Sequence, residues 1–106
     1  MTERIILTAG DVLRIEFLEP LNISNYRLAK EINVSPTLIG KIVKGRQGIT
    51  ADIALRLSMF FGNTPKFWLN LQSICELEKT KEIFKTEGIN IIPYKKFAEK
   101  PKKKLA

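Results

Sequence analysis

The chain has 106 residues, a formal net charge of +7 and a hydrophobic content of 44%. This length suits one domain with a modest core, because two domains of half the size would each bury too little surface to be stable. The chain lacks both a run of about 18 apolar residues and a secretion-signal pattern, so we expect a cytoplasmic protein with no membrane partner. The single cysteine, Cys75, excludes an internal disulfide, and because histidine is absent we expect no metal and no cofactor.

Positive charge is concentrated in two parts of the chain. Residues 24–50 carry five basic groups and one acidic group, and residues 93–106 carry six lysines and one glutamate. Residues 1–23 are acidic on balance, and residues 51–92 are neutral. Because a phosphate-binding surface needs such a local excess of positive charge, nucleic acid is the favoured partner.

The first predicted helix opens at residues 8–10 and runs to about Glu19. Leu13 and Phe17 recur at helical spacing and are expected to face inward. Pro20 is expected to stop this helix, because proline has no backbone N–H and its ring collides with the preceding turn.

Residues 24–46 contain the pattern of two short helices joined by a tight turn. Leu28, Ala29 and Ile32 fall on one face of the first helix. Asn33 then stands where the chain must turn, and Asn tolerates the left-handed conformation better than most residues. These features predict that the first helix of the pair ends at this turn.

The second helix of the pair is predicted to begin with Ser35 as N-cap and Pro36 in its first turn, and to end at Gly45. A steep crossing of two helices needs a small residue at the contact, and Ala29 stands five residues before Val34. This pattern is typical of a DNA-binding helix-turn-helix, whose second helix enters the major groove. An ordinary helical hairpin is the alternative, but the local excess of positive charge favours DNA.

The DNA interpretation assigns roles by position in the two helices. Outward side chains near the start of the second helix are expected to contact bases, and Lys41 is the best single candidate because its amine reaches guanine O6 or N7. A phosphate-bound or solvated lysine is the alternative. The predicted base contacts are Ser35, Pro36, Thr37, Leu38 and Lys41. The predicted phosphate contacts flank them and are Ser24, Asn25, Arg27, Lys44, Arg46 and Thr50.

Two further helices complete the expected fold. Thr50 caps the first of them, and Gly62 ends it. Pro65 begins a long helix that runs to about Phe84. The expected architecture is therefore an all-α bundle of five helices.

The chain is expected to divide into a helix-turn-helix domain over residues 1–87 and an extension over residues 88–106. Within this extension, residues 89–92 are compatible with a short strand. The lysine-rich segment 93–106 has little to bury and is expected to be mobile.

The first half of the long helix is dense in large apolar residues around its whole circumference. Core packing accounts for most of them, but a domain of this size cannot bury every side of one helix. We therefore expect part of this helix to form a two-fold dimer interface, which also places two recognition helices ~34 Å apart. The predicted interface residues are Phe67, Trp68, Leu71 and Ile74.

Two runs of sequence resemble the HigA-type antitoxins, also called virulence-associated protein I, of the Cro/CI-like (XRE) helix-turn-helix class. These runs are RLAKEINVSPTLIGKIVKG and ITADIALRLSMFFGNTPKFWLNLQSICELE. The opening AGDVLRIEFLEPLNIS is similar to the start of that family, with Ala9 in place of its proline. The resemblance implies a lambda-repressor-like fold and a dimeric autorepressor. It also implies a partner, an HigB-type toxin that is a small ribosome-dependent mRNA-cleaving RNase.

Two other functions remain open at this point. A stand-alone phage- or plasmid-type repressor would share the fold but lack a toxin partner, and the neighbouring gene separates it from an antitoxin. A protein-interaction module would use the basic surfaces to bind a protein or RNA. An enzyme is not expected, because the chain lacks histidine, a phosphate-binding glycine loop and a pair of carboxylates in an apolar setting.

Overall fold

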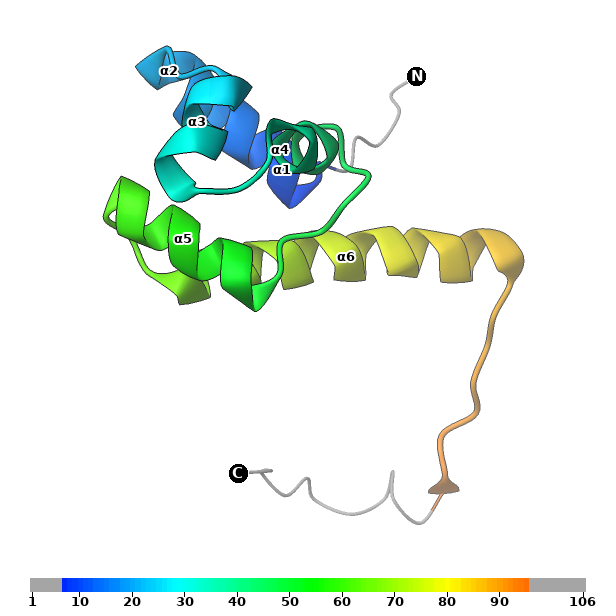
Figure 1. The fold of residues 1–106 in the computed structure, drawn as a ribbon. Coiled ribbons are helices and arrows are strands. Elements are labelled where there is room, and N and C mark those ends of the chain that lie inside the picture. The colour runs from blue at the N-terminus through cyan, green and yellow to red at the C-terminus, as the bar shows by residue number, and fades with distance from the viewer. Residues whose placement is uncertain (1–6, 96–106) are drawn as a thin grey trace.

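The computed structural model describes residues 7–95, which form five helical segments and no strand. The first segment is continuous and consists of α1 (Ala9–Val12), the wider turn η1 (Leu13–Leu18) and α2 (Glu19–Leu21). The others are α3 (Asn25–Ile32), α4 (Pro36–Val43), α5 (Ala51–Phe61) and α6 (Pro65–Glu87). Figure 1 shows α6 running beneath α1, α3 and α4, alongside α5, and extending beyond them. The all-α prediction is confirmed.

The first helix begins with a reciprocal cap between Thr8 and Asp11. The Thr8 hydroxyl accepts the backbone N–H of Asp11 at 3.1 Å, and the Asp11 carboxylate accepts the backbone N–H of Thr8 at 2.9 Å. Each bond satisfies a backbone donor that the helix itself leaves without a partner.

Pro20 does not stop this helix, and that prediction was wrong. The chain winds more widely before it, and the N–H of Glu19 donates to the carbonyl of Arg14, five residues back. In a regular α-helix the proline ring would collide with the carbonyl of Glu16, so the wider turn lets the helix pass through Pro20. The segment ends instead at Asn22, which has a left-handed φ of 58°.

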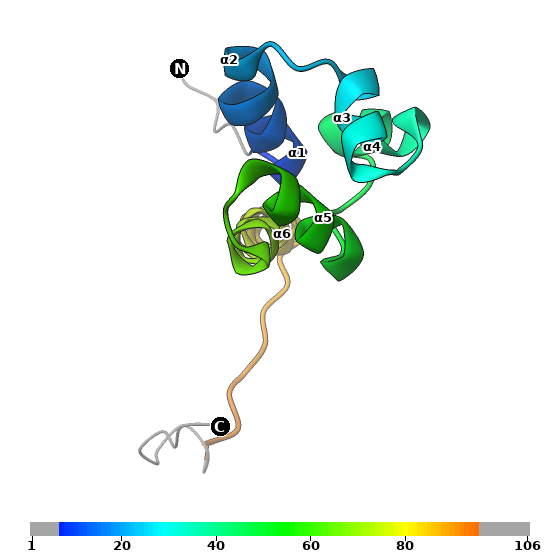
Figure 2. The ribbon, with the colours of Figure 1, turned by 60° about the vertical axis from the view of Figure 1, so that its left-hand side comes forward.

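The predicted pair of helices at residues 24–46 is confirmed. Asn33 ends α3 with a φ of 61°, and the N–H of Val34 donates to the carbonyl of Ala29 at 2.9 Å. Ala29 has no exposed surface, as the close approach of α3 and α4 requires. Figure 2 shows these two helices together on one side of the molecule, with α5 below them.

The last two helices begin at the predicted signals, and α5 also ends at the predicted Gly62. Thr50 and Thr64 each accept a backbone N–H of the helix that follows. Gly62 and Gly88 end these helices with positive φ angles of 82° and 68°. α6 runs to Glu87 and is therefore slightly longer than its predicted end at Phe84.

Residues 89–92 form no strand, and that prediction was wrong. A strand needs a second strand for its backbone hydrogen bonds, and the described part of this single chain offers none. The chain leads away from the helices after Gly88 (Figure 1). Of the segment predicted to be mobile, residues 96–106 lie outside the described residues.

Trp68 lies at the centre of the core. Its ring centroid is 4.9 Å from that of Phe17, 5.0 Å from that of Phe67 and 6.1 Å from that of Phe61. Its indole N–H donates to the side chain of Asn63 at 3.0 Å, so the ring is fully buried without an unsatisfied donor. Among residues 7–95, no helix combines the length and the apolar character needed to cross a bilayer.

Candidate nucleic-acid interface

Several of the predicted contact residues lie at the N-terminal ends of α3 and α4. Ser24, Asn25 and Arg27 are exposed around the first turn of α3. Ser35 and Thr37 are exposed at the start of α4. The structure therefore places Ser35, Thr37 and one group of predicted phosphate contacts at helix N-terminal ends, where free backbone N–H groups also attract anions. Lys41 lies instead in the last turn of α4.

Three of these predicted contacts also cap helices. The hydroxyl oxygens of Ser24, Ser35 and Thr50 accept the backbone N–H groups three residues ahead, at 3.0, 3.1 and 3.3 Å. Each hydroxyl keeps its own O–H as a donor. Such a residue can therefore hold its helix end and donate to a phosphate oxygen at the same time.

The outward face of α4 carries Pro36, Thr37 and Lys41, all exposed. The opposite face is buried, with Ile39 and Ile42 at 0% and 1% exposure. Leu38 lies between the two faces and packs in part against the core, so it offers a base only a portion of its side chain.

The basic residues at this surface differ in their partners. Arg27 is 3.4 Å from the Glu31 carboxylate in an exposed pair, and such pairs contribute little. Within the described residues, Lys41, Lys44 and Arg46 are exposed and have no ion pair. These three cations are therefore available to an anionic ligand.

Arg56 supports the helix-turn-helix from α5, a role that we did not predict. Its guanidinium donates to the carbonyls of Ile32 at 2.7 Å and Asn33 at 3.3 Å, where α3 ends. Its Nε also donates to the Asp52 carboxylate at 3.1 Å. The Asp52–Arg56 spacing was visible in the sequence, but the contact with α3 was not.

Two contacts position α4 and the loop that follows it. A Cβ built on Gly10 would lie 1.7 Å from the carbonyl oxygen of Ile42, so α1 and α4 cross in direct backbone contact. Farther along, the N–H of Ile49 donates to the side chain of Gln72 on α6 at 2.9 Å. These contacts hold the recognition helix against α1 and its following loop against α6.

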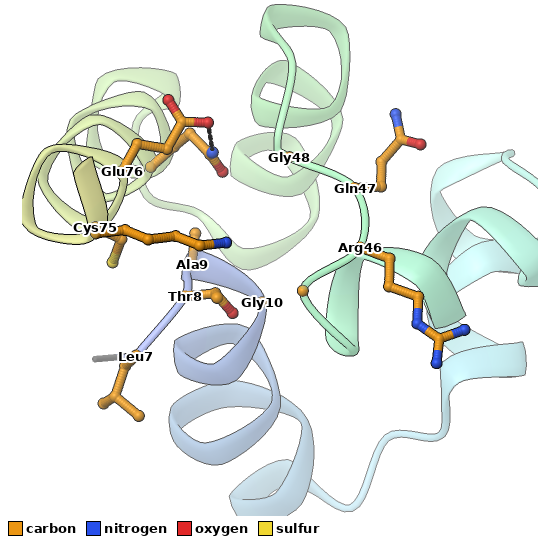
Figure 3. Close-up of a pocket in the computed structure, with 12 residues that line it drawn as sticks. Leu7, Thr8, Ala9, Gly10, Arg46, Gln47, Gly48, Cys75 and Glu76 are labelled. Carbon is orange, nitrogen blue, oxygen red and sulfur yellow. Dashed lines mark hydrogen bonds between the residues drawn. The ribbon is translucent and has the colours of Figure 1, made fainter. Parts of the chain in front are cut away.

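An open cavity of about 370 Å³ lies between the start of α1, the loop after α4 and α6. Figure 3 shows Cys75 at its edge and the Arg46 side chain directed away from Cys75 and α6. Burial, and secondarily the charge of Asp11, raises the pKa of the Cys75 thiol, so the protonated form is favoured. Across residues 7–95, no group of three or more His, Cys, Asp or Glu side chains is placed to bind a metal.

The predicted dimer residues on α6 separate into two groups. Trp68 is 0% exposed and has no surface to offer a second chain, so it belongs to the core instead of the interface. Leu71 is half-buried, whereas Phe67 and Ile74 are 40% and 60% exposed. Sequence spacing alone assigned all four residues to the dimer interface, because apolar residues occur on every side of this helix.

Four exposed apolar residues, which we call the α6 stripe, follow one face of this helix. Their spacings of seven, three and seven residues match the repeat by which helices pair in coiled coils. Leu77 and Phe84 extend the face that Phe67 and Ile74 begin, and they were not predicted. The stripe consists of Phe67, Ile74, Leu77 and Phe84, which are 40%, 60%, 55% and 41% exposed.

Comparison with known proteins gives consistent results. Residues 15–69 match the helix-turn-helix family. Virulence-associated protein I of Dichelobacter nodosus is 43% identical over 83 residues, which cover 78% of this chain and 75% of that protein. Antitoxin HigA-1 of Vibrio cholerae serotype O1 is 34% identical over 92 residues, which cover 87% of each.

The fold is also similar to that of a solved structure, the Pseudomonas aeruginosa antitoxin HigA with the higBA promoter. The TM-score is 0.77 at 34% identity, and the match covers 84% of this chain and 97% of the other. This chain therefore belongs to the helix-turn-helix family that includes the HigA antitoxins and virulence-associated protein I.

Proposed function

We propose that this protein is a DNA-binding antitoxin that represses its own operon by placing α4 in the major groove of operator DNA. The observation that carries this proposal is the outward face of α4, which presents exposed polar and basic side chains without internal ion partners. The related antitoxin HigA structure with promoter DNA supports it.

Within this proposal, the residues on the start of α4 contact bases and the flanking residues contact phosphates. Lys41 donates to a guanine in the major groove, and Thr37 contacts a neighbouring base edge. Ser24, Asn25 and Arg27 clamp the backbone at one end of the motif. Lys44, Arg46 and Thr50, which follow the recognition helix, clamp the backbone at the other end.

A two-fold dimer presents two such surfaces to one operator. The α6 stripe is the interface that we propose, together with the half-buried Leu71. Exposed apolar side chains in this number on one helix face are covered when two copies pair, and the pairing sets the distance between recognition helices.

The proposed protein partner is an HigB-type toxin, a small mRNA-cleaving RNase. The support is the similarity to antitoxin HigA-1 and to the HigA structure, whose names carry that role. The protein acts by binding to this toxin and to DNA, without a catalytic step of its own. Co-expression with the neighbouring reading frame tests the proposed toxin partner. We expect the protein to restore growth and to co-purify with the product of that reading frame. If the protein did not relieve the toxicity, the stand-alone repressor would be the remaining interpretation.

The DNA proposal is tested by a mobility-shift titration. The protein is titrated against a duplex from upstream of its own gene and against a scrambled duplex, at two salt concentrations. We expect preference for the first duplex to persist at the higher salt, because base contacts do not depend on released counterions. Equal affinity for both duplexes would contradict sequence-specific repression.

The role of Lys41 is tested in the same assay. Lys41→Ala is expected to cost about 1–3 kcal/mol on the intact operator and to relax discrimination at one base pair. Lys66→Ala, which removes another exposed lysine, from the first turn of α6, is the matched control and should have little effect. Uniform weakening on every operator variant would instead make Lys41 a phosphate contact.

A further inference from the structure

Gly40 lies in the middle of the recognition helix α4, which spans Pro36–Val43. Glycine is unfavourable inside a helix, because it loses more backbone freedom on folding than any other residue. Such a position normally has a packing or conformational reason in the protein itself.

The other five glycines of the chain each have such a reason. A Cβ on Gly10 would lie 1.7 Å from a carbonyl oxygen, and one on Gly48 would lie 2.9 Å from the side chain of Gln72. The remaining three have the positive φ angles that other residues rarely adopt, and they are Gly45, Gly62 and Gly88.

Gly40 has neither reason. A Cβ built on it would meet no atom within 4 Å, and its φ is that of an ordinary helical residue. The interior of the protein therefore does not require glycine here, and the missing side chain leaves a gap that opens outward beside Thr37 and Lys41.

The space at Gly40 is open, because no side chain comes within 4 Å of a Cβ built there. Residues three and four positions away are neighbours on a helix surface, and for Gly40 these are Pro36, Thr37, Val43 and Lys44. They supply a proline ring, a threonine methyl group, a valine side chain and the hydrocarbon part of a lysine. Val43 is only 8% exposed, so the hydrocarbon groups that surround this open space are those of Pro36, Thr37 and Lys44. A small apolar group of a ligand can therefore approach the helix backbone at Gly40.

We propose that Gly40 determines sequence specificity by accommodating the C5 methyl group of a thymine in the operator. The proposal rests on the function proposed above, in which α4 enters the major groove. The thymine methyl is the apolar group that base pairs display in that groove, and it distinguishes thymine from every other base. A side chain at position 40 would occupy the space that the methyl group needs.

The test removes one methyl group from the DNA or adds one to the protein. The DNA is the duplex from upstream of the protein's own gene, intact or with single thymines replaced by deoxyuridine. Wild-type protein is expected to lose about fourfold in affinity at one thymine of each half-site, the effect of one buried methyl group. Gly40→Ala is expected to bind the intact duplex at least fourfold more weakly and to regain affinity on the duplex that lacks that methyl group.

Thermal unfolding separates this effect from misfolding. Gly40→Ala is expected to raise the unfolding midpoint by about 4 °C, because alanine is the better helix former and meets no atom. Thr80→Ala, at an exposed position of α6, is the control that raises helix propensity away from α4. It should leave binding to every duplex unchanged.

The outcomes are distinct. If Gly40→Ala binds the intact duplex as well as wild-type protein does, the proposal is overturned. If Gly40→Ala binds weakly but no deoxyuridine position affects wild-type protein, the assignment to a thymine methyl is overturned. If wild-type protein does not prefer the intact duplex over a scrambled one, the proposed DNA function fails and this inference fails with it.

Discussion

At the scale of single residues, Arg56 connects the helix-turn-helix to the rest of the domain. Its guanidinium donates to two carbonyls at the end of α3, where the helix leaves such acceptors without intrahelical partners. A cation is also favoured at a helix C-terminus by the helix dipole. The residue therefore stabilises the turn that sets the angle between α3 and α4, although it is not expected to touch DNA.

We predict that Arg56→Ala lowers the free energy of unfolding by about 1–2 kcal/mol. This value is smaller than that of a buried charged hydrogen bond, because the Arg56 side chain is partly exposed. Urea denaturation measures the change. Arg27→Ala is the control, since Arg27 has only the exposed pair with Glu31, and it should cost under about 0.5 kcal/mol. Equal effects of the two substitutions would argue against a special role for Arg56.

At the scale of elements, the packing of α1 against α4 positions the recognition helix. The two helices touch through their backbones at Gly10, where a side chain has no space. The same first segment also passes through Pro20 by means of a wider turn and ends at Asn22. The recognition helix is thus oriented by contacts on both of its neighbours, α1 and α3.

We predict that Gly10→Ala destabilises the protein by at least about 2 kcal/mol, because the added methyl group would overlap the carbonyl of Ile42 and force the helices apart. Gly40→Ala provides a matched comparison within the same chain. The identical substitution should there increase stability, since the space is open. Thermal unfolding shows whether each substitution lowers or raises the unfolding midpoint. A loss of stability in both variants would contradict this account.

At the scale of the whole molecule, α6 presents an apolar face that residues 7–95 do not cover. The four residues of the α6 stripe are all exposed, while Trp68 on the opposite side of the helix is fully buried. One face of α6 therefore packs in the core, and another face is exposed and available to a partner. In the proposed repressor that partner is a second copy.

We predict that wild-type protein is a dimer in solution and that Leu77→Glu weakens dimerisation at least about tenfold, because a two-fold interface would then bury two like charges. Thr86→Glu places the same charge at an exposed position of α6 on the side of the helix away from the stripe and should leave the dimer intact. Sedimentation equilibrium measures both constants. A monomeric wild-type protein, or a Leu77→Glu variant that dimerises normally, would exclude this interface.

The sequence by itself determined the number of helices and most of their limits, because those depend on neighbours in the chain. Ser35 and Thr50 cap the helices that they were predicted to cap, and Asn33 turns the chain between α3 and α4. The family resemblance rested on the same local runs and is confirmed by the comparisons. The contact roles of the residues on α3 and α4 stay predictions.

Only the tertiary structure decided which face of each helix is buried in the core and which face remains exposed. Spacing showed that α6 is apolar on several sides, but the burial of Trp68 and the exposure of Leu77 depend on where α5 and the first helix pack. The contact of Arg56 with Ile32 and that of Gly10 with Ile42 join residues far apart in the chain. Local propensity acts over a few neighbouring residues, whereas these contacts exist only after distant segments have met.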